Sequence, residues 1–553
     1  MKNILQKNAI WGIIIFFPVA LYFYFLSEYA INIPKWDDHA LKAFIVEFQN
    51  ANGFAAKIQA IFKQHNEHRI AFDRFFTLIV FYLHGTIEYR WLMWIGNFTL
   101  LGILFIFFRV FKKTNLPIAY FAPIPLIFFQ LQLWENTFWG MAAMQNFGVV
   151  FFILGLIYLI CSDKKSHFYL AILFAFFATY TSGNGITAFP ICIVLLVLQK
   201  RFKESIVFGL VSAILIFLYF FHYQMPPSNP PMNGIGIGKI ALGFLSFLGS
   251  AFDLLPYSSG RVKVTILFGA IFLALSAVIS VLLALNSKLI NRRRDLSSIE
   301  LFILGSLMFL IGTGIVVTYT RISFGEVGLL TSRYKIYSVL LTVTLYLAIV
   351  SKFNVNRFSW VVFPIVGIAI LFNFITNFIN FKEVVNFRNQ LMSFSYNWAL
   401  DSSVQPKNNG IKLYETPTFP LDNHLSQLKN RIQFSPVWLE KVTKSVNSNG
   451  IFIQNSSFKN NVNNTNSVNI IVQSAARTYL MPTQLSNFPV SGFVRTAKYW
   501  QNGFASDLNY NEFDNGKYYL GILIQEGKNI QQYYLNDSLI VNKNINSKVK
   551  TNW

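Results

Sequence analysis

Long apolar runs are the feature that most restricts what this chain can fold into. Four of them, residues 9–26, 264–285, 301–320 and 360–378, are long enough to cross a hydrocarbon core about 30 Å thick at about 1.5 Å per residue. Lipid offers no hydrogen bonds to a backbone, so such runs fold as helices. Only 13% of the 553 residues are charged and the mean hydropathy is +0.44, whereas soluble domains carry about 25% charged residues. An all-α polytopic membrane bundle is therefore expected.

The distribution of basic residues orients this bundle. The formal net charge is +22, but the basic residues interrupt apolar segments instead of forming one stripe, which argues against a nucleic-acid partner. Connections at 134–146, 181–185 and 222–238 contain no Lys or Arg. By the positive-inside rule they face outward, and the basic connections are cytoplasmic. The basic set is Arg109/Lys112/Lys113, Lys164/Lys165, Lys200/Arg201/Lys203, Lys288/Arg292/Arg293/Arg294 and Lys352/Arg357.

This alternation predicts about eleven spanning helices, with the N-terminus inside and everything after about residue 380 outside. Lys2 and Lys7 precede the first run, but no small-x-small cleavage site follows it, so the run is expected to be an uncleaved helix. Segments 239–255 and 70–84 would break the alternation and are expected to be interfacial or re-entrant. The expected spans are 9–27, 91–110, 118–134, 147–161, 168–181, 185–198, 205–221, 264–285, 300–319, 334–351 and 359–379.

The chain changes character after the last span. A transmembrane domain is expected over 1–380 and an extracytoplasmic domain over 381–553, mostly β from about residue 400. Asn and Ser are frequent there, and 455–469 is expected to be a polar surface loop. Short runs separated by turn formers predict strands at 469–472, 490–494, 518–524 and 531–535. The two cysteines, Cys161 and Cys192, lie in apolar segments, so neither a disulfide framework nor a cysteine metal site is expected.

Polar residues of possible chemical use cluster in the first outward loop. Asp37, Asp38 and His39 follow the first span. Adjacent carboxylates repel each other and need a cation, a metal or water to stay ionised. Beside a lipid surface such a pair suits a general base that deprotonates an acceptor hydroxyl. An ordinary solvated loop is the alternative. About thirty residues later the chain reads His65-Asn66-Glu67-His68-Arg69.

Three further clusters fall on the same predicted face. Glu135 and Asn136 lie among aromatic residues; an interfacial belt explains the tryptophans but not these two. The Gly183-Asn184-Gly185 link can form a nest of N–H groups that binds anions or sugar hydroxyls, although a plain helix–helix turn fits equally well.

The last cluster is basic: Arg321, and Arg333 within Ser332-Arg333-Tyr334. Arginine on an outward face suits an anionic headgroup, and the pair could clamp a phosphate. An ordinary anionic phospholipid is the alternative ligand.

At these residues the chain resembles the GT-C superfamily of membrane glycosyltransferases, multi-helix enzymes with a carboxylate motif in the first outward loop. The Asp37-Asp38 pair matches that signature in position and chemistry. The chain also resembles a group of uncharacterised bacterial membrane proteins through His-Asn-Glu-His-Arg at 65–69, Trp-Glu-Asn at 134–136 and Ser-Arg-Tyr at 332–334. The resemblance covers roughly residues 1–380.

The resemblance implies a reaction class. A sugar would pass from a polyprenyl-phosphate carrier in the cytoplasmic (inner) membrane to an extracytoplasmic glycan or lipid acceptor, by single displacement with inversion. Asp37 or Asp38 would be the base, and Arg321 and Arg333 would stabilise the departing phosphate. No cofactor is implied, although paired carboxylates leave room for a divalent cation. The implied substrate-binding residues are His39, Glu67, His68, Arg69, Glu135, Asn136, Asn184, Arg321, Arg333 and Tyr334.

Two rival readings belong to other classes. A transporter or flippase for lipid-linked glycans usually shows inverted repeats and polar residues near mid-membrane. Here the polar clusters fall at helix ends, and no repeat is visible. A non-catalytic anchor that displays the tail would need far fewer helices.

Overall fold

The computed structural model describes residues 8–225, 234–256, 258–287, 294–352, 359–399, 406, 410–415, 439–447, 449–463, 465–527 and 529–542. Its contacts divide the chain into two compact units. The helical unit comprises residues 1–26, 50–79 and 91–379, and the mixed unit comprises 27–49, 80–90 and 380–553. The two short segments 27–49 and 80–90 therefore group with the C-terminal residues, although the sequence-based division at 380 assigned them to the transmembrane domain.

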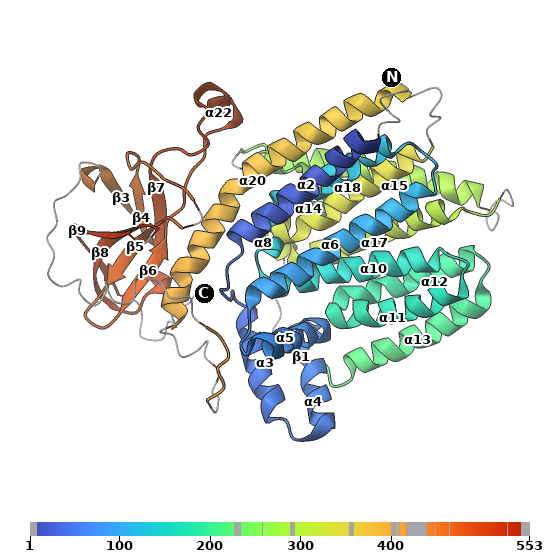
Figure 1. Cartoon of the computed structure of the whole chain (residues 1–553), viewed down its shortest axis with the longest axis horizontal. Helices are drawn as coiled ribbons and strands as arrows, with labels where there is room; N and C mark the ends of the chain where they lie inside the picture. The colour runs from blue at the N-terminus through green and yellow to red at the C-terminus, as the bar shows by residue number, and fades with distance from the viewer. Residues whose placement is uncertain are drawn as a thin grey trace. The chain divides into compact units, whose positions relative to one another are not determined.

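Helices dominate the chain, with the strands gathered near its C-terminal end (Figure 1). The longer helices are α2 (Asn8–Tyr29), α3 (Asp38–Asn50), α4 (Gly53–Phe62), α5 (Ala71–His84), α6 (Tyr89–Lys112), α10 (Gly148–Ile160), α11 (Lys165–Thr181), α12 (Ala188–Leu198), α13 (Phe202–Phe220), α14 (Ile237–Leu248), α15 (Arg261–Asn286), α17 (Ser298–Arg321), α18 (Lys335–Val350) and α20 (Val362–Ala399). Short helices α7 (Pro123–Phe128), α8 (Trp134–Thr137) and α9 (Gly140–Ala142) form the connection between α6 and α10.

Within the described residues, eight helices are long and apolar enough to cross a membrane. They coincide with eight of the eleven predicted spans: Asn8–Tyr29, Tyr89–Lys112, Gly140–Ile160, Phe202–Phe220, Arg261–Asn286, Ser298–Phe324, Ser332–Val350 and Val362–Ala399.

The other three predicted spans are shorter or broken. Pro123 and Pro125 interrupt 118–134, because proline lacks the N–H that an interior helical position donates. The segment forms η1 (Ile118–Phe121), α7 and η2 (Leu131–Leu133). Helix α11 has only 17 residues, and Gly183–Leu198 is a shorter apolar helix. The count of eleven stays a prediction. Helices α5 and α14, in the two segments expected to be interfacial, have 14 and 12 residues.

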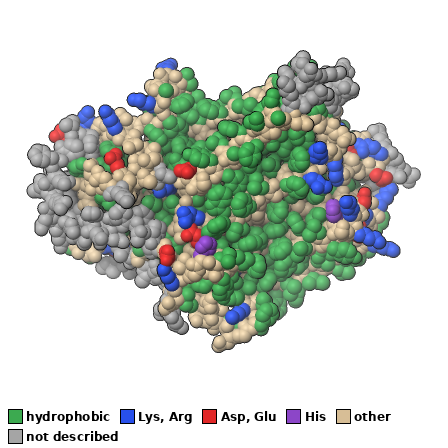
Figure 2. Space-filling view, in the orientation of Figure 1, with side chains coloured by type: hydrophobic (Ala, Val, Ile, Leu, Met, Phe, Trp, Pro, Cys, Tyr) green, Lys and Arg blue, Asp and Glu red, His purple; other side chains and the backbone are tan. Residues whose placement is uncertain are grey.

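Apolar side chains cover the outside of the helical unit as well as its core. Ile13, Ile206 and Leu267 are 69%, 65% and 58% exposed, and Figure 2 shows apolar side chains across this face of the bundle. Helices that are apolar on both faces are typical of a lipid environment. The mostly helical class and the small C-terminal β region are thus confirmed, and the helices indicate a membrane protein.

Basic connections meet at one end of this unit. The Lys113 ammonium donates to the Ser298 hydroxyl at 3.0 Å. Arg294 and Lys352 both donate to the Glu300 carboxylate, at 2.6 Å each. Three of the predicted cytoplasmic connections therefore lie together, while the side of the membrane that they face stays a prediction. Four members of the predicted basic set lie outside the described residues: Lys288, Arg292, Arg293 and Arg357.

The mixed unit contains two antiparallel sheets. The first has the order β3-β4-β7 and the second β6-β5-β8-β9. Strands β5, β8 and β9 confirm the runs predicted at 469–472, 518–524 and 531–535. The strands are β3 (Val442–Asn447), β4 (Gly450–Asn455), β5 (Ser467–Gln473), β6 (Thr478–Pro482), β7 (Phe504–Asn509), β8 (Gly516–Glu526) and β9 (Asn529–Val541).

The strand predicted at 490–494 is wrong. These residues belong to helix α22 (Val490–Thr496), which begins directly after Pro489 and ends at Ala497 in a left-handed conformation. Proline favours the start of a helix, and apolar residues at 490, 493 and 494 follow helical spacing, not the alternation of a strand.

Buried apolar residues of the two sheets and of the second half of α20 form one core. Ile470, Leu520 and Ile522 from the four-stranded sheet belong to the same cluster as Phe394 and Trp398 of α20. The Ser393 hydroxyl donates to the Asn469 side chain at 2.6 Å, which ties the helix to β5. Helix α20 has 38 residues, about twice what a membrane crossing needs, so its second half is available to support the sheets.

Candidate functional site

The His-Asn-Glu-His-Arg motif forms a two-stranded hairpin, β1 (Gln64–His65) and β2 (His68–Arg69). Asn66 has φ 47°, in the left-handed region that asparagine tolerates better than most residues, so Glu67 lies at the tip. The Arg69 guanidinium donates to the carbonyls of Phe62 and Tyr219, at 2.6 Å each. These carbonyls end helices α4 and α13, so Arg69 anchors the hairpin.

Glu67 at that tip pairs with Arg321 at the end of α17. Their Oε1 and Nη2 atoms are 3.6 Å apart, and the two side chains are 40% and 31% exposed. Gly325, with φ 83°, follows Arg321 within one turn, so the chain breaks where the sequence places a glycine. An exposed pair of this kind contributes about 0–1 kcal/mol to stability, so the pair opens at small cost.

The Trp-Glu-Asn and Ser-Arg-Tyr motifs, nearly 200 residues apart, interlock. Arg333 Nε lies 3.3 Å from Glu135 Oε1, and its guanidinium lies 5.6 Å from the centre of the Trp139 ring. The Glu135 backbone N–H donates to the Ser332 hydroxyl at 3.0 Å. The Asn136 side chain donates to the Arg333 carbonyl at 3.0 Å. The presence of Glu135 and Asn136 in an apolar loop is therefore explained by this junction.

The Gly183-Asn184-Gly185 link contacts the hairpin on one side and α17 and α18 on the other. The Gly183 N–H donates to His68 Nδ1 at 3.2 Å, so this N–H of the expected nest is already engaged. The Asn184 side chain donates to the Tyr337 hydroxyl at 3.3 Å. A Cβ at Gly185 would lie 2.0 Å from the Ala178 carbonyl oxygen, so only glycine fits there.

Aromatic contacts extend this arrangement to the last motif. Phe247 of α14 lies 6.1 Å from Tyr337 and 6.4 Å from Tyr334, measured between ring centres. Contacts thus run from His68 through Asn184, Tyr337 and Tyr334 to the Arg333 junction. The polar residues of the helical unit that the sequence singled out are therefore connected.

A buried ion cluster borders the same network, and sequence reasoning missed it. Asp253, 2% exposed, accepts two hydrogen bonds from Arg261, at 2.8 and 2.6 Å, and lies 2.9 Å from the Lys335 ammonium. Burial alone would raise the pKa of Asp253, but the two cations hold it below its usual value. Two sequence signals could have indicated this cluster: Asp253 is an ionisable residue in an apolar segment, and Lys335 directly follows Ser-Arg-Tyr.

The acidic pair belongs to the mixed unit. Asp38 is fully buried at the start of α3, and its Oδ2 accepts the Lys35 backbone N–H at 3.1 Å. Asp37 is only partly buried. The His39 ring packs edge-on against Trp398, with 5.3 Å between ring centres.

Lys42, one helical turn after Asp38, is 1% exposed, and its Nζ lies 4.6 Å from the centre of the Trp398 ring. Burial, opposed by the Asp38 carboxylate, lowers the pKa of Lys42 to about 8.

The candidate residues thus fall into two groups. Asp37, Asp38 and His39 lie in the mixed unit, and the rest lie in the helical unit. Across the described ranges, no group of three His, Cys, Asp or Glu side chains has the arrangement of a metal site. No family model, curated protein or solved structure matches this chain.

Proposed function

We propose that this chain is an integral membrane glycosyltransferase that moves a sugar from a polyprenyl-phosphate carrier to an acceptor outside the cytoplasmic membrane. The observation that supports this best is the pairing of each outward arginine with a carboxylate: Glu67 with Arg321 and Glu135 with Arg333. Both arginines lie at ends of candidate spanning helices, the depth at which a lipid phosphate resides. Both side chains are about one-third exposed.

The two carboxylates hold the arginine side chains in place until a lipid phosphate replaces the carboxylate as the arginine's partner. A phosphate that replaces Glu135 at Arg333 meets a guanidinium already oriented by the Trp139 ring. Because one anion takes the place of another, the arginine is not left unpaired when the lipid departs. The displaced carboxylate can then accept hydrogen bonds from sugar hydroxyls. A guanidinium binds phosphate through a planar fork that lysine lacks.

The acceptor hydroxyl needs a base, and the proposal assigns this role to Asp37. Asp38 is fully buried and holds the start of α3, so it acts as a positioning residue. The Asp37 carboxylate takes the hydroxyl proton as the acceptor oxygen attacks the anomeric carbon, opposite the phosphate. The carbon–oxygen bond to phosphate then breaks, and its electron pair leaves with the phosphate, whose charge Arg321 and Arg333 stabilise. The anomeric configuration inverts.

The topology belongs to the same proposal. The basic end that contains Lys113, Arg294 and Lys352 faces the cytoplasm. The Glu135–Arg333 junction and the mixed unit then face outward, where a lipid-linked sugar meets its acceptor. The polar network runs along helix ends and connections, whereas a transporter would place it near mid-membrane.

The decisive experiment measures sugar transfer by the full chain in lipid nanodiscs, supplied with a labelled polyprenyl-phosphate sugar and a membrane glycolipid extract. Asp37→Asn should lower the rate about 10²- to 10⁴-fold, the usual contribution of a general base. Sugar that crosses a liposome membrane on its carrier without changing acceptor would instead identify a flippase. Equal transfer rates for wild type, Asp37→Asn and Asp38→Asn would remove the base assignment.

The phosphate clamp has its own test. Charge-assisted hydrogen bonds contribute about 1.5–3 kcal/mol, so Arg333→Ala should weaken donor binding by about 10- to 150-fold, and Arg333→Lys should restore only part of it. Glu135→Gln removes the competing anion and should tighten donor binding. The matched control is Arg109→Ala, an exposed arginine in the last turn of α6, which should bind normally. Full rescue by lysine would show a contact with bulk lipid instead of a clamp.

A further inference from the structure

Residues 486–501 of the mixed unit form a hairpin that carries helix α22 at its tip. The Phe488 N–H donates to the Tyr499 carbonyl at 2.8 Å, and the Gln501 N–H donates to the Ser486 carbonyl at 2.9 Å. Figure 1 shows α22 standing away from both sheets, and none of its residues is buried. The tip is therefore a surface that the described residues of the mixed unit leave uncovered.

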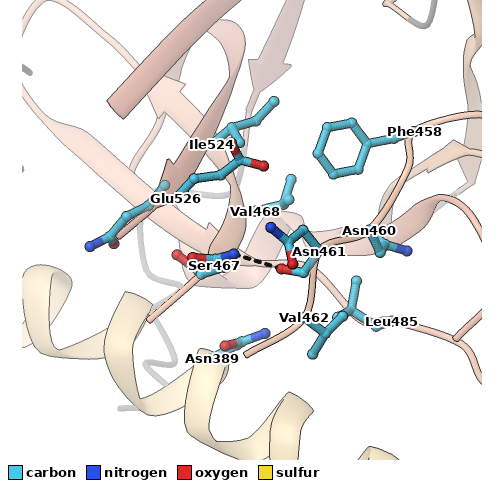
Figure 3. Close-up of a pocket in the computed structure, with 12 residues that line it drawn as sticks. Asn389, Phe458, Asn460, Asn461, Val462, Ser467, Val468, Leu485, Ile524 and Glu526 are labelled. Carbon is cyan, nitrogen blue, oxygen red and sulfur yellow. Dashed lines mark hydrogen bonds between the residues drawn. The ribbon is translucent and has the colours of Figure 1, made fainter. Parts of the chain in front are cut away.

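The base of the hairpin is fixed to helix α20. The Leu485 N–H donates to the Asn386 side chain at 2.9 Å, and the Asn386 amide donates back to the Leu485 carbonyl at 3.1 Å. The Leu485 side chain lines a small hollow together with Asn389 of α20 and Val462 of the loop that follows β4 (Figure 3). A base held in this way limits the directions in which the tip can point.

The hairpin meets α20 near the residue where that helix completes a membrane crossing. Helix α20 begins at Val362, and a crossing takes about 20 residues, which brings the helix to about residue 381. There the Tyr499 hydroxyl accepts the Lys382 backbone N–H at 3.0 Å. The Phe381 ring lies 5.4 Å from Tyr499 and 5.9 Å from Trp500, measured between ring centres. Tyrosine and tryptophan are enriched where a membrane meets water.

The exposed side chains of the tip suit an anionic lipid surface. Val490 and Val494, one helical turn apart, are 36% and 76% exposed. Arg495 and Lys498 are exposed beside them. Residues 441–506 contain no Asp or Glu, so no carboxylate within this stretch offsets the two positive charges. Apolar side chains next to basic ones are typical of helices that lie between lipid headgroups and acyl chains.

We infer that the tip of the 486–501 hairpin docks onto the anionic surface of the bilayer that α20 crosses. Val490 and Val494 enter the acyl boundary, and Arg495 and Lys498 bind lipid phosphates. Because α20 already tethers the hairpin to the bilayer, docking costs little translational freedom, and a small contact suffices. The inference stands apart from the proposed transfer reaction, because a chain that only displayed the mixed unit would make the same contact.

A single fluorescent label in lipid nanodiscs tests this inference on the full chain. Val494→Cys can be labelled selectively with an environment-sensitive maleimide dye, because the two native cysteines, Cys161 and Cys192, are buried. In nanodiscs of phosphatidylglycerol brominated in the upper acyl chain, emission should fall about twofold or more relative to unbrominated lipid, since an interfacial helix lies about 5–10 Å into the headgroup boundary. The matched control is Val446→Cys, a β3 valine that is 70% exposed; its label should not be quenched.

The contribution of charge is measured in the same nanodiscs. Arg495→Gln combined with Lys498→Gln should lower the ratio of docked to undocked hairpins, read from the two fluorescence lifetimes, by about 30-fold, or about fivefold for each charge. Both side chains are exposed, so the variant should fold normally. Neutral phosphatidylcholine nanodiscs should lower the ratio for the unsubstituted hairpin in the same direction.

The inference is overturned if the label at position 494 is unquenched in anionic nanodiscs, or if the charge variant docks as fully as the native hairpin. A water-shielded label in detergent as well as in nanodiscs would identify a second copy of the chain as the occupant, which also overturns it. Because no sugar donor is present in this assay, its result is independent of the catalytic proposal.

Discussion

Replacing Lys42 by methionine should stabilise the mixed unit near neutral pH, because the native chain buries a charged amine away from solvent. The residue is 1% exposed, and its Nζ makes no hydrogen bond to any described group. Burial, opposed in part by Asp38, lowers the pKa of Lys42 from 10.5 to about 8. Methionine is similarly long and carries no charge.

The sign and size of the effect follow from linkage. The folded-state pKa lies below the unfolded one, so between about pH 8 and 10.5 the unfolded chain binds the extra proton and stability rises with pH. Below about pH 8 the whole penalty is present, about 3 kcal/mol at about 1.4 kcal/mol per pH unit. The cation–π contact with Trp398 offsets about 0.5–2 kcal/mol of this. Lys42→Met should therefore gain about 1–2.5 kcal/mol at pH 7.

The assay is thermal unfolding of the purified full chain in detergent, followed by tryptophan fluorescence at pH 7, 8 and 9.5. The wild-type midpoint should rise from pH 8 to 9.5, whereas the Lys42→Met midpoint should start higher and change less. Lys459→Met, at an exposed position in the same unit, is the matched control. A lower midpoint for Lys42→Met at pH 7, or the same pH dependence as wild type, would refute the reasoning.

Three shorter predictions concern the helical unit and the topology. Cysteines at positions 225 and 456, in place of Met225 and Ser456, are both exposed and should both react with a membrane-impermeant reagent in intact cells; reaction of only one contradicts the eleven-helix topology. Glu300→Gln should lower the unfolding midpoint, because the buried carboxylate that binds two cations contributes about 3 kcal/mol; an unchanged midpoint contradicts this. Gly269→Ala should reduce the yield of folded protein in size-exclusion chromatography, because its Cβ would lie 1.8 Å from the Leu245 carbonyl oxygen; a normal yield contradicts the close crossing of α14 and α15.

Sequence patterns predicted the parts of the fold that depend on local physics. Hydropathy located eight helices because each must be apolar along its own length. Short runs bounded by turn formers located β5, β8 and β9, because these signals are also local. The pattern failed at 490–494, where Pro489 starts a helix in a run that contains β-formers. It also joined 118–134 into one helix, although the prolines divide that segment into short pieces.

The candidate site was less accessible to sequence reasoning because its contacts are long-range. Nothing local indicates that Glu135 meets Arg333, or that Asp253 meets Lys335. Glu135 and Arg333 stood out only as ionisable groups near apolar segments, and Asp253 and Lys335 were not singled out. The sequence could supply that signal, because charge near lipid is costly, but only the packing of helices can assign the partner.

The paired charges also explain why basic residues are tolerated at the end of the helical unit where Lys and Arg are otherwise scarce. There Arg321, Arg333 and Lys335 each lie within 4 Å of a carboxylate, but the three pairs differ in exposure. The Lys335 partner, Asp253, is fully buried, so breaking that pair would leave an uncompensated charge, and the pair is structural. The pairs of Arg321 and Arg333 are partly exposed and can open at small cost. Under the proposed function, an anionic substrate group would therefore exchange into these two positions and not into the third, which makes Arg321 and Arg333 the better candidates for recognition and Lys335 for support.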